Sequence, residues 1–223
     1  MDLEPIWLSL KLAFLTTILL LFIGIPVAYW LSRKQNGLKI VIEALITMPL
    51  VLPPSVLGFY LLLAFSPNNA LGKWLNQHFD LQLVFSFKGL VFASILYSLP
   101  FMISPIKTAF SHLPRSIAEA SYTMGKSHMR TFFSVLLPNV KSSVFTAAVL
   151  TFAHTLGEFG VVLMIGGNIP GETKVASIAI YDSVETMDYS SANNYALILF
   201  SITFVIVVGV FIFNRSAVKN PFE

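Results

Sequence analysis

The sequence contains no cysteine and very little charge, since Asp, Glu, Lys and Arg together make up 11% of its 223 residues. The lack of cysteine excludes a disulfide scaffold, a zinc site with cysteine ligands and an iron–sulfur cluster. Soluble domains carry about 25% charged residues, so this chain has too few to cover a water-facing surface. Its net charge of +3 is too small to predict a nucleic-acid partner. These shortages are typical of a protein that lies in a lipid bilayer.

Apolar residues take the place of the missing charges, because 56% of the chain is hydrophobic. A transmembrane helix needs about 20 mostly apolar residues, and the runs in this chain lack the alternation of a membrane β-strand. We therefore expect an all-α membrane protein with one transmembrane domain over residues 1–223 and about five transmembrane helices. The predicted spans are residues 8–32, 42–66, 87–108, 141–166 and 190–214.

The Lys and Arg residues are divided unequally between the two sides that these spans define. One side holds ten of them, and the other holds Lys73, Lys88 and Lys174, with Lys11 at the mouth of the first span. Loops rich in Lys and Arg stay in the cytoplasm, so we expect the N-terminus outside and the C-terminus inside. The ten residues are Arg33, Lys34, Lys39, Lys107, Arg115, Lys126, Arg130, Lys141, Arg215 and Lys219.

The cytoplasmic loop expected at residues 109–138 contains a motif with fixed spacing. It reads EAS at 119–121, then three residues, a glycine, nine residues, and VLLP at 135–138. This pattern resembles the EAA loop of ABC-importer permeases, with a serine in place of the second alanine. The resemblance implies two short helices, joined by a glycine turn, that couple the chain to a separate ATPase subunit. The residues assigned to this coupling are Glu119, Ala120, Ser121, Gly125, Leu137 and Pro138.

The same loop also indicates that ATP is bound by a partner and not by this chain. We expect the small side chains of Ala118, Ala120 and Ser121 to form a face that seats in a groove on the ATPase. The Gly-Lys-Ser sequence at 125–127 resembles the end of a Walker A motif, but the earlier glycine that a P-loop needs is replaced by Ala120. The chain is therefore predicted to be a transport subunit without its own ATPase motif, and not an enzyme.

Three further segments are similar to the molybdate permease branch of these importers: MPLVLPP at 48–54, TLGEFG at 155–160 and NIPGET at 168–173. The resemblance implies a homodimer in the cytoplasmic membrane of a bacterium or archaeon. It also implies two copies of a separate ABC ATPase and an external oxyanion-binding protein that delivers molybdate. Tungstate and sulfate permeases share these segments and remain alternatives. A secondary carrier that works alone is less favoured, because such carriers commonly contain two related halves and this chain shows no repeat.

Two groups of residues are candidates for a gate or a transport path. Pro49, Pro53 and Pro54 interrupt the second span and are expected to bend it. In the fourth span, His154 and Glu158 lie one turn apart. We expect Glu158 to pair with His154, a hydroxyl or a backbone amide at a gate or dimer seam; a structural polar residue near the outer interface is the alternative.

The path itself is expected to bind an anion weakly. No Lys or Arg lies in the middle of any predicted span, and a carboxylate would repel an oxyanion. The sequence also lacks an H-E-x-x-H motif. We therefore expect no catalytic residue, cofactor or metal site, and we expect specificity to reside in the external binding protein.

Overall fold

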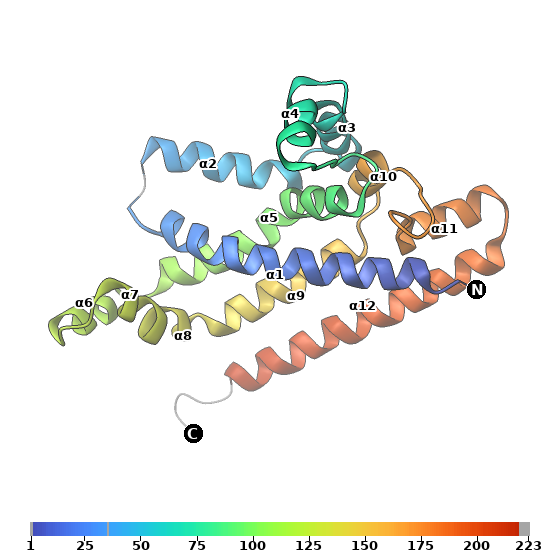
Figure 1. Ribbon diagram of the computed structural model, residues 1–223. Coiled ribbons are helices and arrows are strands. Elements are labelled where there is room, and N and C mark those ends of the chain that lie inside the picture. The colour runs from blue at the N-terminus through green and yellow to red at the C-terminus, as the bar shows by residue number, and fades with distance from the viewer. Residues whose placement is uncertain (1, 35, 219–223) are drawn as a thin grey trace.

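The computed structural model describes residues 2–34 and 36–218, with side chains up to residue 212. Every regular element in these residues is helical, which confirms the all-α fold (Figure 1). Apart from the 3₁₀ turn η1 and the π-helical segment η2, the elements are α-helices. The elements are α1 (Glu4–Ser32), α2 (Gly37–Thr47), η1 (Met48–Leu50), α3 (Pro54–Phe65), α4 (Ala70–Phe79), α5 (Phe87–His112), α6 (Arg115–Thr123), α7 (His128–Thr131), η2 (Phe132–Leu136), α8 (Leu137–Asn139), α9 (Lys141–Leu156), α10 (Gly160–Gly166), α11 (Ala176–Glu185) and α12 (Tyr189–Val218).

Three helices, α1, α5 and α9, pack against one another and form the centre of the molecule. The helices α1 and α5 approach closely at Gly24, where a Cβ atom would lie 2.7 Å from the side chain of Met102. Small residues at such crossings let helices in a membrane gain van der Waals contact, which replaces the hydrophobic driving force of a soluble core. The inner half of this core includes Leu20, Ile106 and Ala147, all fully buried.

Three helices in the described part of the chain are long and apolar enough to cross a membrane: α1, α5 and residues Tyr189–Ile212 of α12. Two further pairs of helices pass the same test together but are bent, so the chain has up to five spans. The first pair, Gly37–Leu50 and Pro54–Phe65, is bent by 111°, and the second, His128–Asn139 and Lys141–Leu156, by 72°. The apolar window of α12 is only 6% buried, which leaves its surface for lipid or another chain.

The structure differs from two of the predicted spans. The span predicted at 42–66 is divided by the sharp bend at residues 51–53, because Pro53 and Pro54 cannot donate backbone hydrogen bonds and restrict the residues before them. The span predicted at 141–166 ends at Leu156, and a turn at 157–159 separates it from α10. Hydropathy did not reveal this second break, because the residues on both sides of it are apolar.

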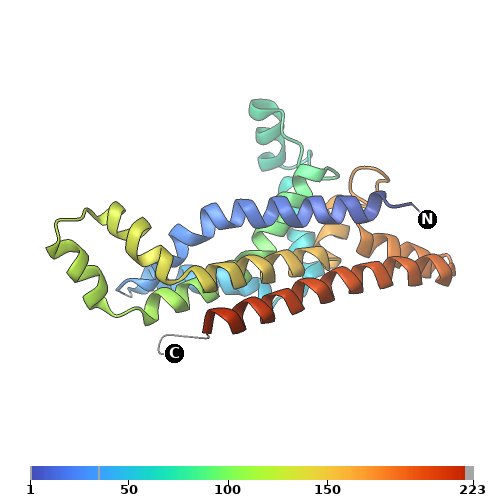
Figure 2. The same cartoon turned by 90° about the horizontal axis from the view of Figure 1, so that it is seen from below.

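The two ends of the bundle carry different features. The helices of the loop predicted at 109–138 project from one end, and the N-terminus and α11 lie at the other (Figures 1 and 2). Arg33, Arg115 and Arg130 belong to the first end, since they lie at the end of α1, in α6 and in α7. Lys219, which was counted with them, lies outside the described residues.

Candidate functional site

The loop at residues 109–138, predicted to be the coupling loop and called so below, contains two helical segments joined by a turn at Gly125. The backbone N–H of Gly125 donates to the carbonyl of Tyr122 (2.9 Å), and that of Lys126 donates to the carbonyl of Ser121 (3.2 Å). This pair of bonds is the Schellman motif that ends many helices, and it requires a left-handed residue. Gly125 has a φ of +76°, and nothing lies within 4 Å of the position of a Cβ atom. The glycine is therefore needed for its backbone conformation and not for space.

The second segment begins immediately after this turn. The Ser127 side chain caps α7 by accepting a hydrogen bond from the backbone N–H of Arg130 (3.3 Å). Helix caps of this kind favour Ser, Thr, Asp or Asn. The Gly-Lys-Ser sequence thus ends one helix and begins the next, which gives it a structural explanation that needs no nucleotide.

The small side chains of α6 do not share one exposed face. Ala118 and Ser121 are buried, and the Ser121 hydroxyl is hydrogen-bonded to that of Thr131 on α7 (2.9 Å). Ala120 and Glu119 are exposed. Ala118 and Ser121 therefore hold the loop together, and the surface open to a partner differs from the one expected from sequence.

Leu137 and Pro138 form the end of the loop next to the membrane domain. Leu137 is half-buried and packs against the inner core, and Pro138 is exposed in α8. Proline is tolerated in the first turn of a helix, where its missing N–H has no partner to lose. The chain bends by 72° before Lys141, so these two residues lie just before the bend between the loop and α9.

A cavity of about 670 Å³ lies where α3, α5, α9 and α10 meet. It is the place where several of the predicted gate residues come together. Its lining consists of Pro54, Ser55, Tyr97, Ala153, His154, Gly157, Glu158, Phe159 and Gly160.

Glu158 lies in the turn between α9 and α10, and its side chain is only 5% exposed. One carboxylate oxygen accepts a hydrogen bond from the hydroxyl of Ser94 on α5 (2.7 Å). The other oxygen, Oε1, has no hydrogen-bond partner among the described residues. The carbonyl of Glu158 accepts a further bond from Ser177 on α11 (2.6 Å). Glu158 therefore links the turn between α9 and α10 to α5 and to α11, at the point where the fourth apolar run is broken.

His154 does not pair with Glu158 but binds a second serine of α5. Its Nδ1 atom lies 3.0 Å from the hydroxyl of Ser98, and its ring stacks on Phe101 with 3.9 Å between centroids. Ser94 and Ser98 are fully buried. Neither serine was predicted as a site residue, although their spacing of four residues in an apolar span indicates one polar stripe on a helix.

The three prolines occupy different places around the bend. Pro54 lines the cavity, Pro53 precedes α3, and Pro49 is buried in η1, which packs on α5. A Cβ atom at Gly160 would lie 2.8 Å from the Cβ atom of Pro54. The start of α3 is thus in tight contact with the start of α10, beside Glu158.

The cavity offers an anion little attraction. None of the nine residues that line it is Lys or Arg, and one of them is a carboxylic acid. Side chains that hold an oxyanion tightly are commonly Arg or Lys, and the lining has neither; its helix N-termini are the starts of α3 and α10. The arrangement suits a passage or a gate better than a storage site.

The loop after α10 is fixed by a polar cluster at the end of the bundle that carries α11. Asp182 of α11 accepts hydrogen bonds from the side chain of Asn168 (2.7 and 2.8 Å) and forms an ion pair with Lys174 (2.5 Å). Partial burial raises the pKa of Asp182, but the bonds from Lys174 and Asn168 outweigh it and hold this pKa below its ordinary value. The cluster therefore stabilises the loop above the ordinary pKa of Asp, about 3.9, and loses this effect as the pH falls through the lowered value.

A helical membrane domain, a two-helix loop at one end and a cavity without Lys or Arg in its lining are the features of a membrane-spanning transport subunit. The chain belongs to the family described as "Binding-protein-dependent transport system inner membrane component", whose model matches residues 13–219. It is 48% identical to the "Molybdenum transport system permease protein ModB" of Azotobacter vinelandii over 203 residues, which cover 90% of this chain and 89% of that protein.

Two other similarities are less specific. The "Probable sulfate transport system permease protein cysT" of Chlorella vulgaris is 33% identical over 186 residues, covering 83% of this chain and 70% of that one. A solved structure of the MetNI methionine ABC transporter in an inward-facing conformation matches with a TM-score of 0.73 at 18% identity, covering 97% of this chain and 96% of that one. At this identity the structural match shows the fold alone.

Proposed function

We propose that this chain is the permease subunit of an ATP-driven importer that carries molybdate. The observation that supports this most strongly is the 48% identity, over 90% of the chain, to a molybdenum permease. Tungstate or sulfate is the alternative cargo, supported by the 33% identity to a sulfate permease. A secondary carrier that works alone is less favoured, because it would leave the coupling loop without a purpose.

The partners follow from the same proposal. Each chain is a single transmembrane domain with spans near those predicted, and two copies form a homodimer. The coupling loops of the two copies dock on two copies of an ABC ATPase. The exposed residues Glu119 and Ala120 belong to the docking surface. An external oxyanion-binding protein delivers the anion to the end that carries α11 and the 166–175 loop, in the inner membrane of a bacterium or archaeon.

The cavity at Glu158 is proposed as part of the gate. The bend at Pro53 and Pro54 supports this role, because α3 and α10 touch there and can separate at a flexible joint. The missing cations also support it, because an anion that is weakly held can pass. Glu158 and His154 then brace the closed state through Ser94 and Ser98 and do not select the anion.

Cellular molybdenum content tests the cargo. In a strain without this gene, grown with trace molybdate, we expect molybdenum measured by elemental mass spectrometry to fall several-fold and to recover when the gene is restored. Excess sulfate should not lower the recovered content. Normal molybdenum in the mutant, together with impaired sulfate uptake, would reassign the cargo to sulfate.

The proposed orientation makes a prediction that suits a chain without cysteine. Met129 in the coupling loop is 68% exposed, and Glu172 in the outer loop is also exposed, whereas nearby Thr173 is fully buried. In intact cells, an impermeant thiol reagent should label a Glu172→Cys variant and should leave a Met129→Cys variant unlabelled until the membrane is opened. The reverse pattern, or labelling of both from outside, would contradict the orientation.

A further inference from the structure

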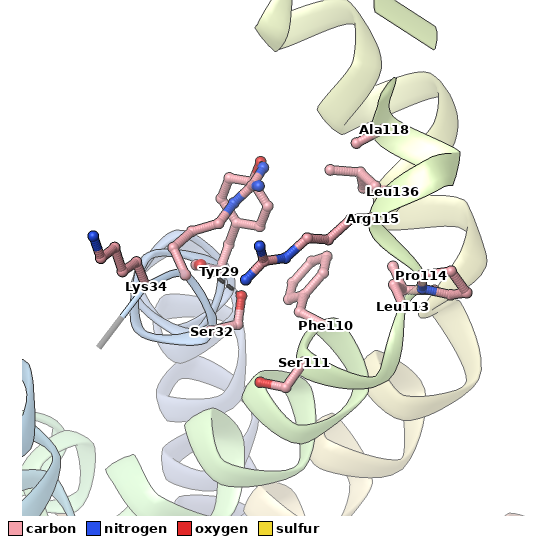
Figure 3. Close-up of a pocket in the computed structure, with 11 residues that line it drawn as sticks. Tyr29, Ser32, Lys34, Phe110, Ser111, Leu113, Pro114, Arg115, Ala118 and Leu136 are labelled. Carbon is pink, nitrogen blue, oxygen red and sulfur yellow. Dashed lines mark hydrogen bonds between the residues drawn. The ribbon is translucent and has the colours of Figure 1, made fainter. Parts of the chain in front are cut away.

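A second cavity, of about 630 Å³, lies at the end of the bundle that carries the coupling loop. It is formed between the end of α1, the end of α5 and the start of α6 (Figure 3). Tyr29, Phe110 and Leu136 give it an apolar wall, and Ser32 and Ser111 contribute hydroxyls. This cavity shares no lining residue with the cavity at Glu158.

Three cations border the cavity: Arg33, Lys34 and Arg115. In the part of the chain that the structure describes, no carboxylate lies within 4.0 Å of any of them, although Glu119 is one turn away from Arg115 on α6. The Arg33 guanidinium contacts the hydroxyl of Tyr29, which is neutral. Figure 3 shows Arg115 extending from α6 toward Ser32 at the end of α1. Within the described residues, no carboxylate therefore pairs with the positive charge of this cavity.

The cavity also lies at the level of a membrane surface. Both α1 and α5 are long enough to cross the bilayer, and the cavity is at the ends where they leave it. Trp30, which is 42% exposed, lies in the last turn of α1, and Trp is enriched at the interface. Basic pockets between transmembrane helices on the cytoplasmic side suit the headgroups of anionic lipids.

We propose that this cavity binds a tetrahedral oxyanion of the phosphate type, with the phosphodiester of an anionic phospholipid as the expected source. Arg33 and Arg115 hold the anion from two sides, and the apolar wall accommodates the start of the acyl chains. Because Arg33 follows a spanning helix and Arg115 begins α6, the bound headgroup connects the coupling loop to the bilayer surface.

Lipid retention by the full chain in its complex tests this proposal. In nanodiscs that contain phosphatidylcholine and phosphatidylglycerol, native mass spectrometry should detect phosphatidylglycerol that stays bound after mild delipidation. An Arg33→Gln/Arg115→Gln variant should weaken this binding about 25-fold, or about fivefold for each side chain, since each cation at an anionic surface contributes about 1 kcal/mol. Arg115→Lys should retain most of the binding.

An arginine of the same loop outside the cavity provides the control. Arg130→Gln should retain phosphatidylglycerol as the wild type does, and equal loss in this variant would overturn the proposal. In discs of phosphatidylcholine alone, molybdate and inorganic phosphate are added as soluble probes. Thermal stabilisation by either anion that is lost in the double variant would support the oxyanion site but assign it a soluble ligand. Absence of both effects in the wild type would overturn it, and the phosphatidylglycerol readout does not depend on the transported anion.

Discussion

Gly125→Val is expected to abolish coupled transport while the permease still inserts and assembles. The φ of +76° at this position is costly for any residue with a Cβ atom, by about 1–2 kcal/mol, and more for a β-branched one. The Schellman motif that ends α6 would then be distorted, and the orientation of α7 relative to α6 would change. We expect ATP-driven uptake to fall by about five- to 30-fold or more, as such a cost implies.

Gly125→Asn is the matched variant, because Asn tolerates the left-handed conformation and the surrounding space is open. It should keep most of the uptake, measured in membrane vesicles alongside the amount of permease and of bound ATPase. If Asn and Val were equally inactive, the conformation of the turn would not be the reason for the glycine. If Val were normal, the loop would not have the coupling role proposed here.

Glu158→Ala should harm the permease much more than Glu158→Gln. The Gln side chain can still accept the hydrogen bond of Ser94, whereas Ala leaves that fully buried hydroxyl without its partner. An unpaired buried group costs about 1–3 kcal/mol, which would shift an equilibrium between open and closed states about five- to 150-fold. We expect the Ala variant to leak or to hydrolyse ATP without transport in the assembled complex.

The choice of anion should not change in either variant. Uptake of molybdate, tungstate and sulfate is measured in reconstituted vesicles, with ATPase activity recorded with and without the binding protein. Ser94→Ala should reproduce part of the Glu158→Ala defect, because it removes the same bond from the other side. A changed preference among the three anions would make Glu158 a selectivity residue and would defeat its role in the gate.

The sequence predicted the features that depend on local composition and spacing. Apolar runs indicated the long helices α1 and α5, because membrane crossing depends on length and hydropathy. The resemblance of the segment from Glu119 to Pro138 to the EAA loop implied two helices and a turn, and glycine at 125 suits that turn because it reaches left-handed backbone conformations readily. Both features are visible within a single segment of chain.

The contacts between segments could not be predicted in this way. The break at Glu158 lies inside a continuous apolar run, and its partner Ser94 is 64 residues away in sequence. Ser121 could equally have faced an ATPase, but the structure directs it toward Thr131. Hydropathy reports that a segment lies in the membrane, and only the packing of helices determines which polar groups meet.

Uptake of molybdate by purified components in sealed vesicles is the most direct test of the central claim. The permease is reconstituted with its ATPase, ATP is enclosed on the ATPase side, and the binding protein is added with molybdate on the other side. We expect accumulation that requires the permease, the ATPase and ATP together and that ceases when any one of them is omitted. Accumulation by the permease alone, driven by an ion gradient without ATP, would contradict the assignment and favour a secondary carrier.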